Sequence, residues 1–250
     1  MNSSKDPSVS SDSSLPSALL LLPNLIAEHQ HHASFLPSSI DAAMASLDGL
    51  IAESASGGRR FLGRFKTKKP YHQIPLALFN VNTLETDIDF LLEPIKKGER
   101  WGYVSDSGLP CIADPGAKLV RRAKQLGIDV QGFIGPSSLM MALMLSGLQG
   151  QRFSFHGYLE REDLALKQQI VRLERRSKED DATQIFMETP YRNQKLLQVL
   201  TETLHEKTEL CVAWDLTLSS QGVLCLPIKA WKKSPLPNLN KRNALFLIYA

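Results

Sequence analysis

The sequence is poor in cysteine and contains no long apolar run. Its three cysteines, Cys111, Cys211 and Cys225, lie far apart and in no C-x-x-C spacing, so neither a disulfide framework nor a zinc site is indicated. No apolar run reaches the roughly 18 residues that a membrane-spanning helix needs. The stretch from Leu15 to Leu25 imitates the core of a signal peptide, but no small-x-small cleavage site follows, and a first buried strand explains it better. We therefore expect a cytoplasmic protein.

Neither sign of charge predominates, and the Gly-rich nucleotide motifs are missing. The 29 Lys and Arg residues against 26 Asp and Glu residues give a net charge of +3, which is too weak to indicate nucleic-acid binding by itself. No G-x-G-x-x-G and no G-x-x-x-x-G-K-[ST] follows a predicted strand, which disfavours nicotinamide and P-loop sites. His29, His31 and His32 stand in a polar segment without a second cluster of ligands, so no metal is predicted.

The remaining composition is that of a globular protein behind a polar tail. Hydrophobic residues make up 43% of the chain and charged residues 22%, close to the average for folded domains. Serine fills eight of the first 17 positions, which predicts a disordered tail over residues 1–15. After the tail, short apolar runs alternate with stretches of helical periodicity, and this alternation is typical of βα units.

This alternation predicts the following strands and helices. The strands are 18–22, 50–53, 74–79, 101–105, 129–134, 153–158, 184–188, 210–215, 222–226 and 244–249. The helices are 84–95, 115–126, 137–146, 165–176 and 192–204. Thr83, Asp114 and Thr189 are the predicted helix N-caps, the last with Pro190 as the first helical residue, and Gly98 and Gly127 are the predicted helix ends.

The pattern indicates two α/β domains. An N-terminal domain is expected over residues 16–149, and a C-terminal domain over residues 150–250. Strands outnumber helices in the second domain, and no long helix separates its last two strands, so its sheet is expected to be mixed. Ligands of such folds bind beyond the carboxyl ends of the strands, and a cleft between the domains is the expected place.

Three loops join a strand to a helix and carry more polar groups than a helix start requires. Residues 104–116 read V-S-D-S-G-L-P-C-I-A-D-P-G and form a stiff loop with free backbone N–H groups. Residues 134–138 read I-G-P-S-S, and residues 187–192 read M-E-T-P-Y-R. Capping explains part of each loop, but three such loops at strand ends favour a binding site over three unrelated helix starts.

These loops resemble those of a known family. Residues 105–116 resemble the S-D-A-G-x-P-x-I-S-D-P-G motif of the RsmI-like branch of the tetrapyrrole (corrin/porphyrin) methylase superfamily, which contains S-adenosylmethionine-dependent methyltransferases. Residues 135–138 are similar to its G-P-[CS]-[AS] loop, residues 152–159 to R-F-x-[FY]-x-G-[FY]-L, and residues 187–192 to [YM]-E-[ST]-x-[HY]-R. The matches run in order from about Gly102 to the end of the chain. Characterised members of this branch methylate a ribose 2′-oxygen of small-subunit ribosomal RNA.

The resemblance weakens before Gly102. Members of the branch carry P-x-P-I-G-N-L after the first strand and later A-E-D-T-R, where this sequence reads L-P-N-L-I at 22–26 and A-E-S-A-S at 52–56. The glycine of the first loop and the Asp-Thr-Arg run are therefore missing. Methyl-donor binding is better supported than specificity for an RNA ribose.

The resemblance implies the fold of this superfamily, not the Rossmann methyltransferase fold, with S-adenosylmethionine bound in the cleft between the domains. Family geometry implies that the donor is held by Gly108, Leu109, Pro110, Ile112, Ser137, Ser138, Met187 and Ala213. The polar candidates for catalysis are Glu188, Tyr191 and Arg192, and Glu53 faces the same cleft from the first domain.

Other functions stay open at this point. The acceptor is ribosomal RNA by resemblance, and the alternative within enzymes is methylation of a tetrapyrrole carbon or another small molecule. A non-catalytic RNA-binding protein is the other alternative, because one segment concentrates positive charge, although it reads equally well as a solvated helix face. That cluster consists of Arg59, Arg60, Arg64, Lys66, Lys68 and Lys69. A homodimer is expected from the resemblance alone.

Overall fold

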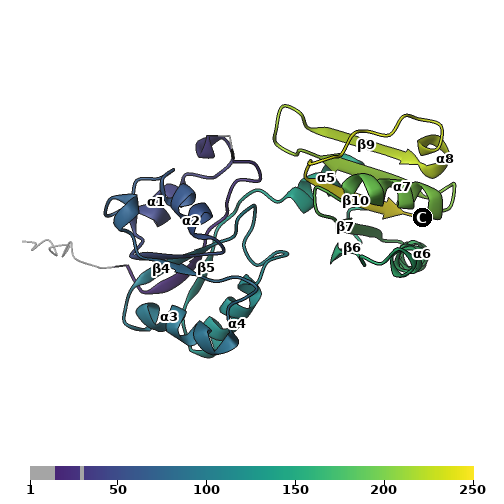
Figure 1. Ribbon diagram of the computed structural model, residues 1–250. Helices are drawn as coiled ribbons and strands as arrows, with labels where there is room; N and C mark the ends of the chain where they lie inside the picture. Colours follow the sequence, from purple (N-terminus) through teal and green to yellow (C-terminus); the bar gives the residue numbers. More distant parts are fainter. Residues whose placement is uncertain (1–14, 29–30) are drawn as a thin grey trace, which may run out of the picture. The chain divides into compact units, whose positions relative to one another are not determined.

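The computed structural model describes residues 15–28 and 31–250. They form two compact units, each with a five-stranded sheet and helices on both of its faces (Figure 1). Unit 1 contains residues 15–24 and 36–134, and unit 2 contains residues 25–28, 31–35 and 135–250. This confirms the predicted class of two α/β domains. The expected donor cleft between them stays a prediction.

The division between the units differs from the predicted domain limits. Helix α5 (Ser138–Ser146) was assigned to the first domain, but its apolar residues pack on the second sheet, so unit 2 begins near Gly135 instead of at residue 150. The predicted tail over residues 1–15 lies outside the described residues except for Leu15. Within residues 15–28 and 31–250, no helix has both the length and the apolar character needed to cross a bilayer.

The sheet of unit 1 is entirely parallel. Its strands are β1 (Ala18–Leu21), β2 (Gly49–Ala52), β3 (Leu76–Leu78), β4 (Arg100–Val104) and β5 (Val130–Gly132). Their order is β3-β2-β4-β1-β5, so β4 lies between β2 and β1. All ten predicted apolar runs of the chain form strands, displaced by at most two residues at their ends.

Helices cover both faces of this parallel sheet, as its buried strands require. Helices α3 (Ile88–Lys96) and α4 (Gly116–Gln125) bury Ile88, Leu92 and Leu119 against one face. Helices α1 (Ser39–Ala45) and α2 (Ala55–Leu62) lie on the opposite side of the sheet (Figure 1). Both were missed from the sequence, α1 because it is short and α2 because it contains two glycines, which are poor helix formers. The unit is completed by the 3-10 turns Tyr71–Gln73 and Glu85–Asp87, and a third turn, His32–Ser34, belongs to unit 2.

Both predicted helix starts in unit 1 are wrong, the first by several residues and the second by one. The Thr83 hydroxyl accepts a hydrogen bond from the Asn80 backbone, inside the preceding turn, and α3 begins only at Ile88. Helix α4 begins at Gly116 instead of at Pro115, although the Asp114 carboxylate still accepts from the Gly116 N–H at 2.6 Å. The predicted ends hold, since Gly98 and Gly127 follow the two helices with φ of +104° and +71°.

The sheet of unit 2 is mixed, as expected. Its strands are β6 (Phe153–Tyr158), β7 (Thr183–Met187), β8 (Glu209–Trp214), β9 (Gly222–Pro227) and β10 (Ala244–Tyr249), in the order β6-β7-β10-β8-β9. Only β6 and β7 are parallel to each other as neighbours, and the other three pairs are antiparallel. Strands β7 and β8 therefore run in the same direction on the two sides of β10.

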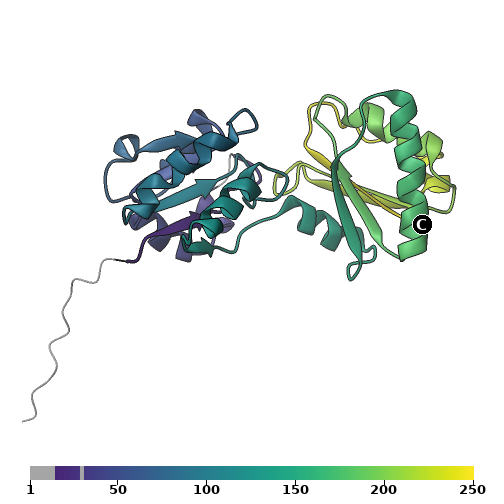
Figure 2. The same cartoon turned by 90° about the horizontal axis from the view of Figure 1, so that it is seen from below.

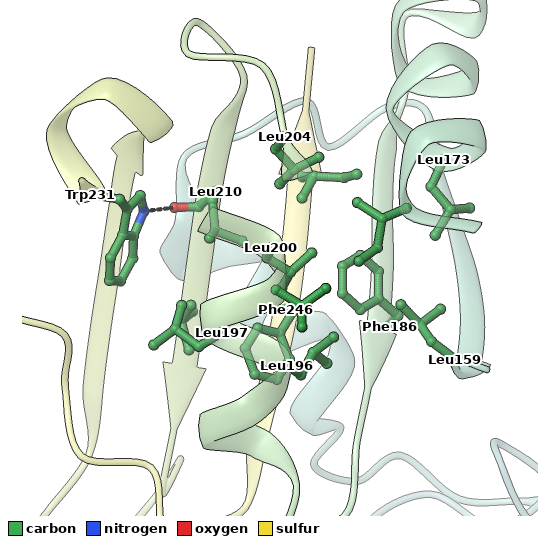
Figure 3. Packing of buried hydrophobic residues seen from close by; sticks show 14 of the residues in the cluster. Leu159, Leu173, Phe186, Leu196, Leu197, Leu200, Leu204, Leu210, Trp231 and Phe246 are labelled. Carbon is green, nitrogen blue, oxygen red and sulfur yellow. Dashed lines mark hydrogen bonds between the residues drawn. The ribbon is translucent and has the colours of Figure 1, made fainter. Parts of the chain in front are cut away.

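Alternate residues of these strands supply two separate cores. One face packs against α6 (Asp163–Asp180), α7 (Asn193–Thr203) and α8 (Ile228–Trp231), with Phe186 and Phe246 stacked at its centre (Figure 3). The indole N–H of Trp231 closes this core by donating to the Leu210 carbonyl at 2.8 Å. The opposite face packs against α5, and Figure 2 shows α5 and α6 on opposite sides of the sheet.

Candidate functional site

The strand order of unit 1 brings three loops together at the carboxyl edge of its sheet. Because β4 lies between β1 and β2, the loop after β4 is flanked by the loops that follow those two strands. The loop after β4 carries residues 105–116, which hold the longest family motif. Any ligand of this motif therefore meets side chains from segments that lie far apart in the sequence.

The loop of residues 105–116, called the motif loop below, holds several residues in left-handed backbone conformations. Gly108 has φ of +67°, and the non-glycine residues Cys111 and Ala113 have φ of +70° and +62°. Such conformations cost free energy and persist only where the surroundings fix them. Asp114 does this, since its carboxylate accepts from the Cys111 N–H at 2.7 Å and from the Tyr103 hydroxyl at 3.0 Å.

Asn24 joins the motif loop to the loop after β1. Its side-chain N–H group donates to the carbonyls of Ser105 at 3.0 Å and Asp106 at 3.1 Å, and its backbone N–H donates to the Gly108 carbonyl at 2.8 Å. The Arg64 guanidinium donates a hydrogen bond to the side-chain oxygen Oδ1 of Asn24 at 2.7 Å. Asn24 belongs to the L-P-N-L-I run that departs from the family pattern, and here it fixes the shape of the motif loop.

The loop after β2 contacts the motif loop on its other side. The Ser54 hydroxyl caps α2 by accepting from the Gly57 N–H at 3.1 Å and donates to Asp106 Oδ1 at 2.9 Å. A Cβ atom on Gly57 would lie 2.4 Å from the same Asp106 oxygen, so a larger residue there would displace this carboxylate. Glu53 Oε2 lies 3.5 Å from the Asp106 N–H. Oε1 of Glu53 is buried and has no hydrogen-bond partner among the described residues.

The electrostatic environment of Glu53 is unusual. Burial of the half-buried carboxyl, together with the negative charges of Asp114 and Asp106, raises its pKa from 4.5 to about 7. Burial also raises the pKa of Asp114, despite the N–H groups and the Tyr103 hydroxyl that bind it. The pKa of the Tyr103 hydroxyl is raised well above its usual range by burial and by Asp114 and Glu53. These groups concentrate negative charge at one end of the sheet.

Unit 1 places four predicted donor residues together in the motif loop. Gly108 and Pro110 are buried, Leu109 is half-buried, and Ile112 is 51% exposed. The loop thus presents apolar side chains beside backbone groups and the Glu53 carboxyl. Their contact with a donor stays a prediction.

Unit 2 brings the other four predicted donor residues to one face of its sheet. Met187 and Ala213 are both register partners of Leu245, which lies on the strand between them. All three contribute to the core beneath α5. Ser137 caps α5, with its hydroxyl 3.4 Å from the Met140 N–H, and Ser138 is the first helical residue. The sequence therefore identified residues that share a face, although it carries no direct sign of the strand order.

The three predicted catalytic residues of unit 2 differ in what they can do. Glu188 is buried, and both of its oxygens have partners: the Thr189 N–H at 2.7 Å and the Arg192 guanidinium at 3.1 Å. Tyr191 is 79% exposed. The predicted helix start at Thr189 and Pro190 is wrong, because an Arg192 N–H bond to the Thr189 carbonyl closes a turn there and α7 begins at Asn193.

The basic cluster of residues 59–69 is partly used inside unit 1. Arg59 donates to the carbonyls of Tyr71 and Ile74, Arg64 binds Asn24 as described, and Lys68 pairs with an aspartate at 2.7 Å. Lys66 and Lys69 are exposed. In the part of the chain that the structure describes, no group of three or more His, Cys, Asp or Glu side chains is placed to hold a metal ion.

The sequence resembles curated methyltransferases over most of its length, although no family model matches it. The ribosomal RNA small subunit methyltransferase I of Thermotoga maritima is 30% identical over 174 residues, which cover 70% of this chain and 73% of that protein. The chain belongs to this methyltransferase family. The protein of the same name from Xylella fastidiosa is 30% identical over 80% of this chain and 70% of its own length. The relative from Bacillus subtilis is 31% identical, and the match covers 56% of its length.

Solved structures confirm the fold of this methyltransferase. Diphthine synthase matches with a TM-score of 0.63 at 15% identity, covering 93% of this chain and 90% of that one. The methyltransferase CobJ matches with 0.59 at 16% identity, covering 93% and 92%. The uroporphyrin-III-C-methyltransferase of Thermus thermophilus matches with 0.53 at 14% identity and the same coverage. The resemblance to the RsmI-like branch of the tetrapyrrole methylases is thereby confirmed, and the protein is an enzyme of the methyltransferase class.

Proposed function

We propose that this methyltransferase transfers a methyl group from S-adenosylmethionine to a ribose hydroxyl of small-subunit ribosomal RNA. The observation that carries the proposal is the motif loop, which keeps the family pattern and is fixed on one side by Asn24 and internally by Asp114. The names of the relatives support the ribosomal RNA as acceptor.

The motif loop has the chemistry that the donor needs. Gly108 keeps the backbone free of a side chain at a positive φ, which permits close approach to a ligand. Leu109 and Ile112 offer apolar surface, and Pro110 stiffens the loop between them. S-adenosylmethionine supplies, when bound, an electrophilic methyl group on a positively charged sulfur. Alignment of acceptor and donor then accounts for most of the catalysis, without a metal.

The second set of donor contacts and the acceptor contacts belong to unit 2. Ser137, Ser138, Met187 and Ala213 stay assigned to the donor by resemblance. The exposed ring of Tyr191 and the guanidinium of Arg192 suit an acceptor that offers a base to stack on and a phosphate to bind.

The partners and the location follow from this function. Lys66 and Lys69 add exposed positive charge for a polyanionic substrate. A homodimer is proposed from the family resemblance alone, and a single 27.8 kDa species in sedimentation at micromolar concentration would exclude it. Location in the cytoplasm is proposed because the substrate is the ribosomal small subunit and the three cysteines are free.

A label-transfer experiment tests this function. The protein is incubated with S-adenosylmethionine carrying a tritiated methyl group and with purified small subunits, total RNA or a porphyrinoid precursor in parallel. A ribose 2′-O-methyl group blocks alkaline cleavage of the adjacent phosphodiester, so we expect label in alkali-resistant dinucleotides of the small-subunit RNA. Label on the porphyrinoid alone would favour the tetrapyrrole alternative and overturn the proposal.

A further inference from the structure

One buried carboxylate oxygen at the carboxyl edge of the unit 1 sheet accepts no hydrogen bond from the described residues. Glu53 Oε1 is buried and has no hydrogen-bond partner within residues 15–28 and 31–250, while Oε2 makes one long contact of 3.5 Å to the Asp106 N–H. Unpaired buried acceptors cost free energy, and where they persist they call for an explanation such as a catalytic role or a bound ligand.

The neighbouring carboxylates are, by contrast, occupied. Both oxygens of Asp114 accept from backbone N–H groups, and Asp106 Oδ1 accepts from the Ser54 hydroxyl. Glu188 also has a partner on each of its oxygens, the Thr189 N–H and the Arg192 guanidinium. Glu53 therefore has free acceptor capacity beside the loop that carries the donor motif.

We infer that Glu53 is the general base of this methyltransferase: its half-buried carboxylate accepts the hydrogen bond of the acceptor hydroxyl and takes its proton. The inference rests on the proposed function, and it assigns a residue that matches the A-E-D-T-R run of the family, although the three residues after it do not. The site on unit 1 then contains both the donor loop and the group that prepares the acceptor.

The step balances in atoms and charge. A lone pair of the acceptor oxygen forms the bond to the methyl carbon as the bond from that carbon to sulfur breaks. The electron pair of the broken bond stays on sulfur, which becomes a neutral thioether. The hydroxyl proton passes to the carboxylate of Glu53 and later leaves to solvent. Proton acceptance of this kind contributes typically 10²–10⁴ to a rate.

The charges around Glu53 suit this role. Burial disfavours ionisation of the Glu53 carboxyl, and so do the carboxylates of Asp114 and Asp106, which face it from the motif loop. Tyr103 faces it from β4. The carboxylate is consequently a stronger base than an exposed glutamate while still half ionised near neutral pH. A base of this strength is matched to work at pH 7.

Substitution of Glu53 by glutamine tests the role. Gln keeps the size of the side chain but cannot take a proton. We expect Glu53→Gln to keep the donor affinity within a factor of a few by calorimetry, and to lower single-turnover methyl transfer to small-subunit RNA by at least about 100-fold. In the unmodified enzyme the rate should fall tenfold per pH unit below about pH 7, and in Glu53→Gln this dependence should disappear. Glu53→Asp should retain it at a reduced rate.

A matched control lies on the same sheet at its other end. Glu99 is exposed, directly precedes β4 and accepts from the Trp101 indole at 2.7 Å, and Glu99→Gln should leave the rate and the pH profile unchanged. An active enzyme with an equally active Glu53→Gln variant would overturn the role of Glu53 alone. Loss of donor affinity together with activity would make Glu53 a donor ligand and also overturn it. An unmodified enzyme that binds donor but methylates no RNA would refute the proposed function, and the role of Glu53 with it.

Discussion

Replacing Glu53 by glutamine should also increase the stability of the folded protein, whereas most substitutions decrease it. The pKa of Glu53 is raised from 4.5 to about 7 by burial and by Asp114 and Asp106. Between these pH values the unfolded chain has lost the proton and the folded chain still holds it, so the folded state becomes less stable as pH rises from about 4.5 to 7, and the loss stays in place above pH 7. Glu53→Gln removes this loss and should stabilise the protein at pH 8.

The magnitude follows from the two pKa values. A tenfold change in a proton equilibrium is worth about 1.4 kcal/mol, so the full difference corresponds to about 3.4 kcal/mol. Because water screens the charges around a half-buried carboxyl, we expect only about half of this free energy, roughly 1.7 kcal/mol, to appear as a change in stability. For a chain of this size that raises the melting temperature by about 3–6 °C.

Thermal unfolding at pH 5 and pH 8 measures the effect. Most of the gain should be absent at pH 5, where Glu53 is protonated in the folded state and partly protonated in the unfolded state. Glu99→Gln should show no such pH dependence. A Glu53→Gln variant that is no more stable than the unmodified protein at pH 8, or that loses stability equally at both pH values, would show that Glu53 Oε1 is paired and ionised, contrary to the reasoning here.

Three further substitutions test the rest of the site, and a fourth, Gly127→Val, is a control. Gly108→Val and Gly127→Val place a β-branched side chain at φ of +67° and +71°, and each should cost about 1–2 kcal/mol, but only Gly108→Val should abolish donor binding in calorimetry. Asn24→Asp keeps the side-chain oxygen that accepts from Arg64 but loses the N–H group that donates to the motif loop. The affinity for the methyl donor should therefore fall about five- to tenfold. An unchanged affinity would show that the motif loop holds its shape without this hydrogen bond. Tyr191→Ala should lower methyl transfer about tenfold with an unchanged melting temperature, since its side chain is exposed; a loss of several degrees would make Tyr191 structural.

Local patterns were enough to predict the strands and the class of fold. Every predicted strand is present because each is a short apolar run between turn residues. The mixed sheet of unit 2 followed from the lack of a long helix between β9 and β10, where only the four-residue α8 lies. Helix starts were harder to predict, because a Ser, Thr or Asp can also close a turn, as Thr83 does. The domain limit was misplaced because α5 is apolar on all sides, so its sequence does not indicate which sheet it covers.

The candidate site could be predicted only in part. The motif loop was visible as a run of Gly, Pro and Asp after a buried strand, and its family pattern named the donor residues. The state of Glu53 was not visible, because it depends on the pairing of β2 with β4, which lie about 50 residues apart, and on Asp114 beyond them. The role of Asn24 was hidden for the same reason, since β1 pairs with β4 across an even longer stretch.

These contacts show where the departures from the family pattern lie in the fold. They fall in the loops after β1 and β2, which are the two neighbours of the motif loop, and not in the motif loop itself. Asn24 still holds the motif loop through its side chain, and Ser54 still caps α2 and binds Asp106. The motif loop is thus held in place although the glycine and the Asp-Thr-Arg run are missing. Because the motif loop keeps its contacts, we expect the sequence differences to change the fit to the acceptor and not to abolish methyl transfer.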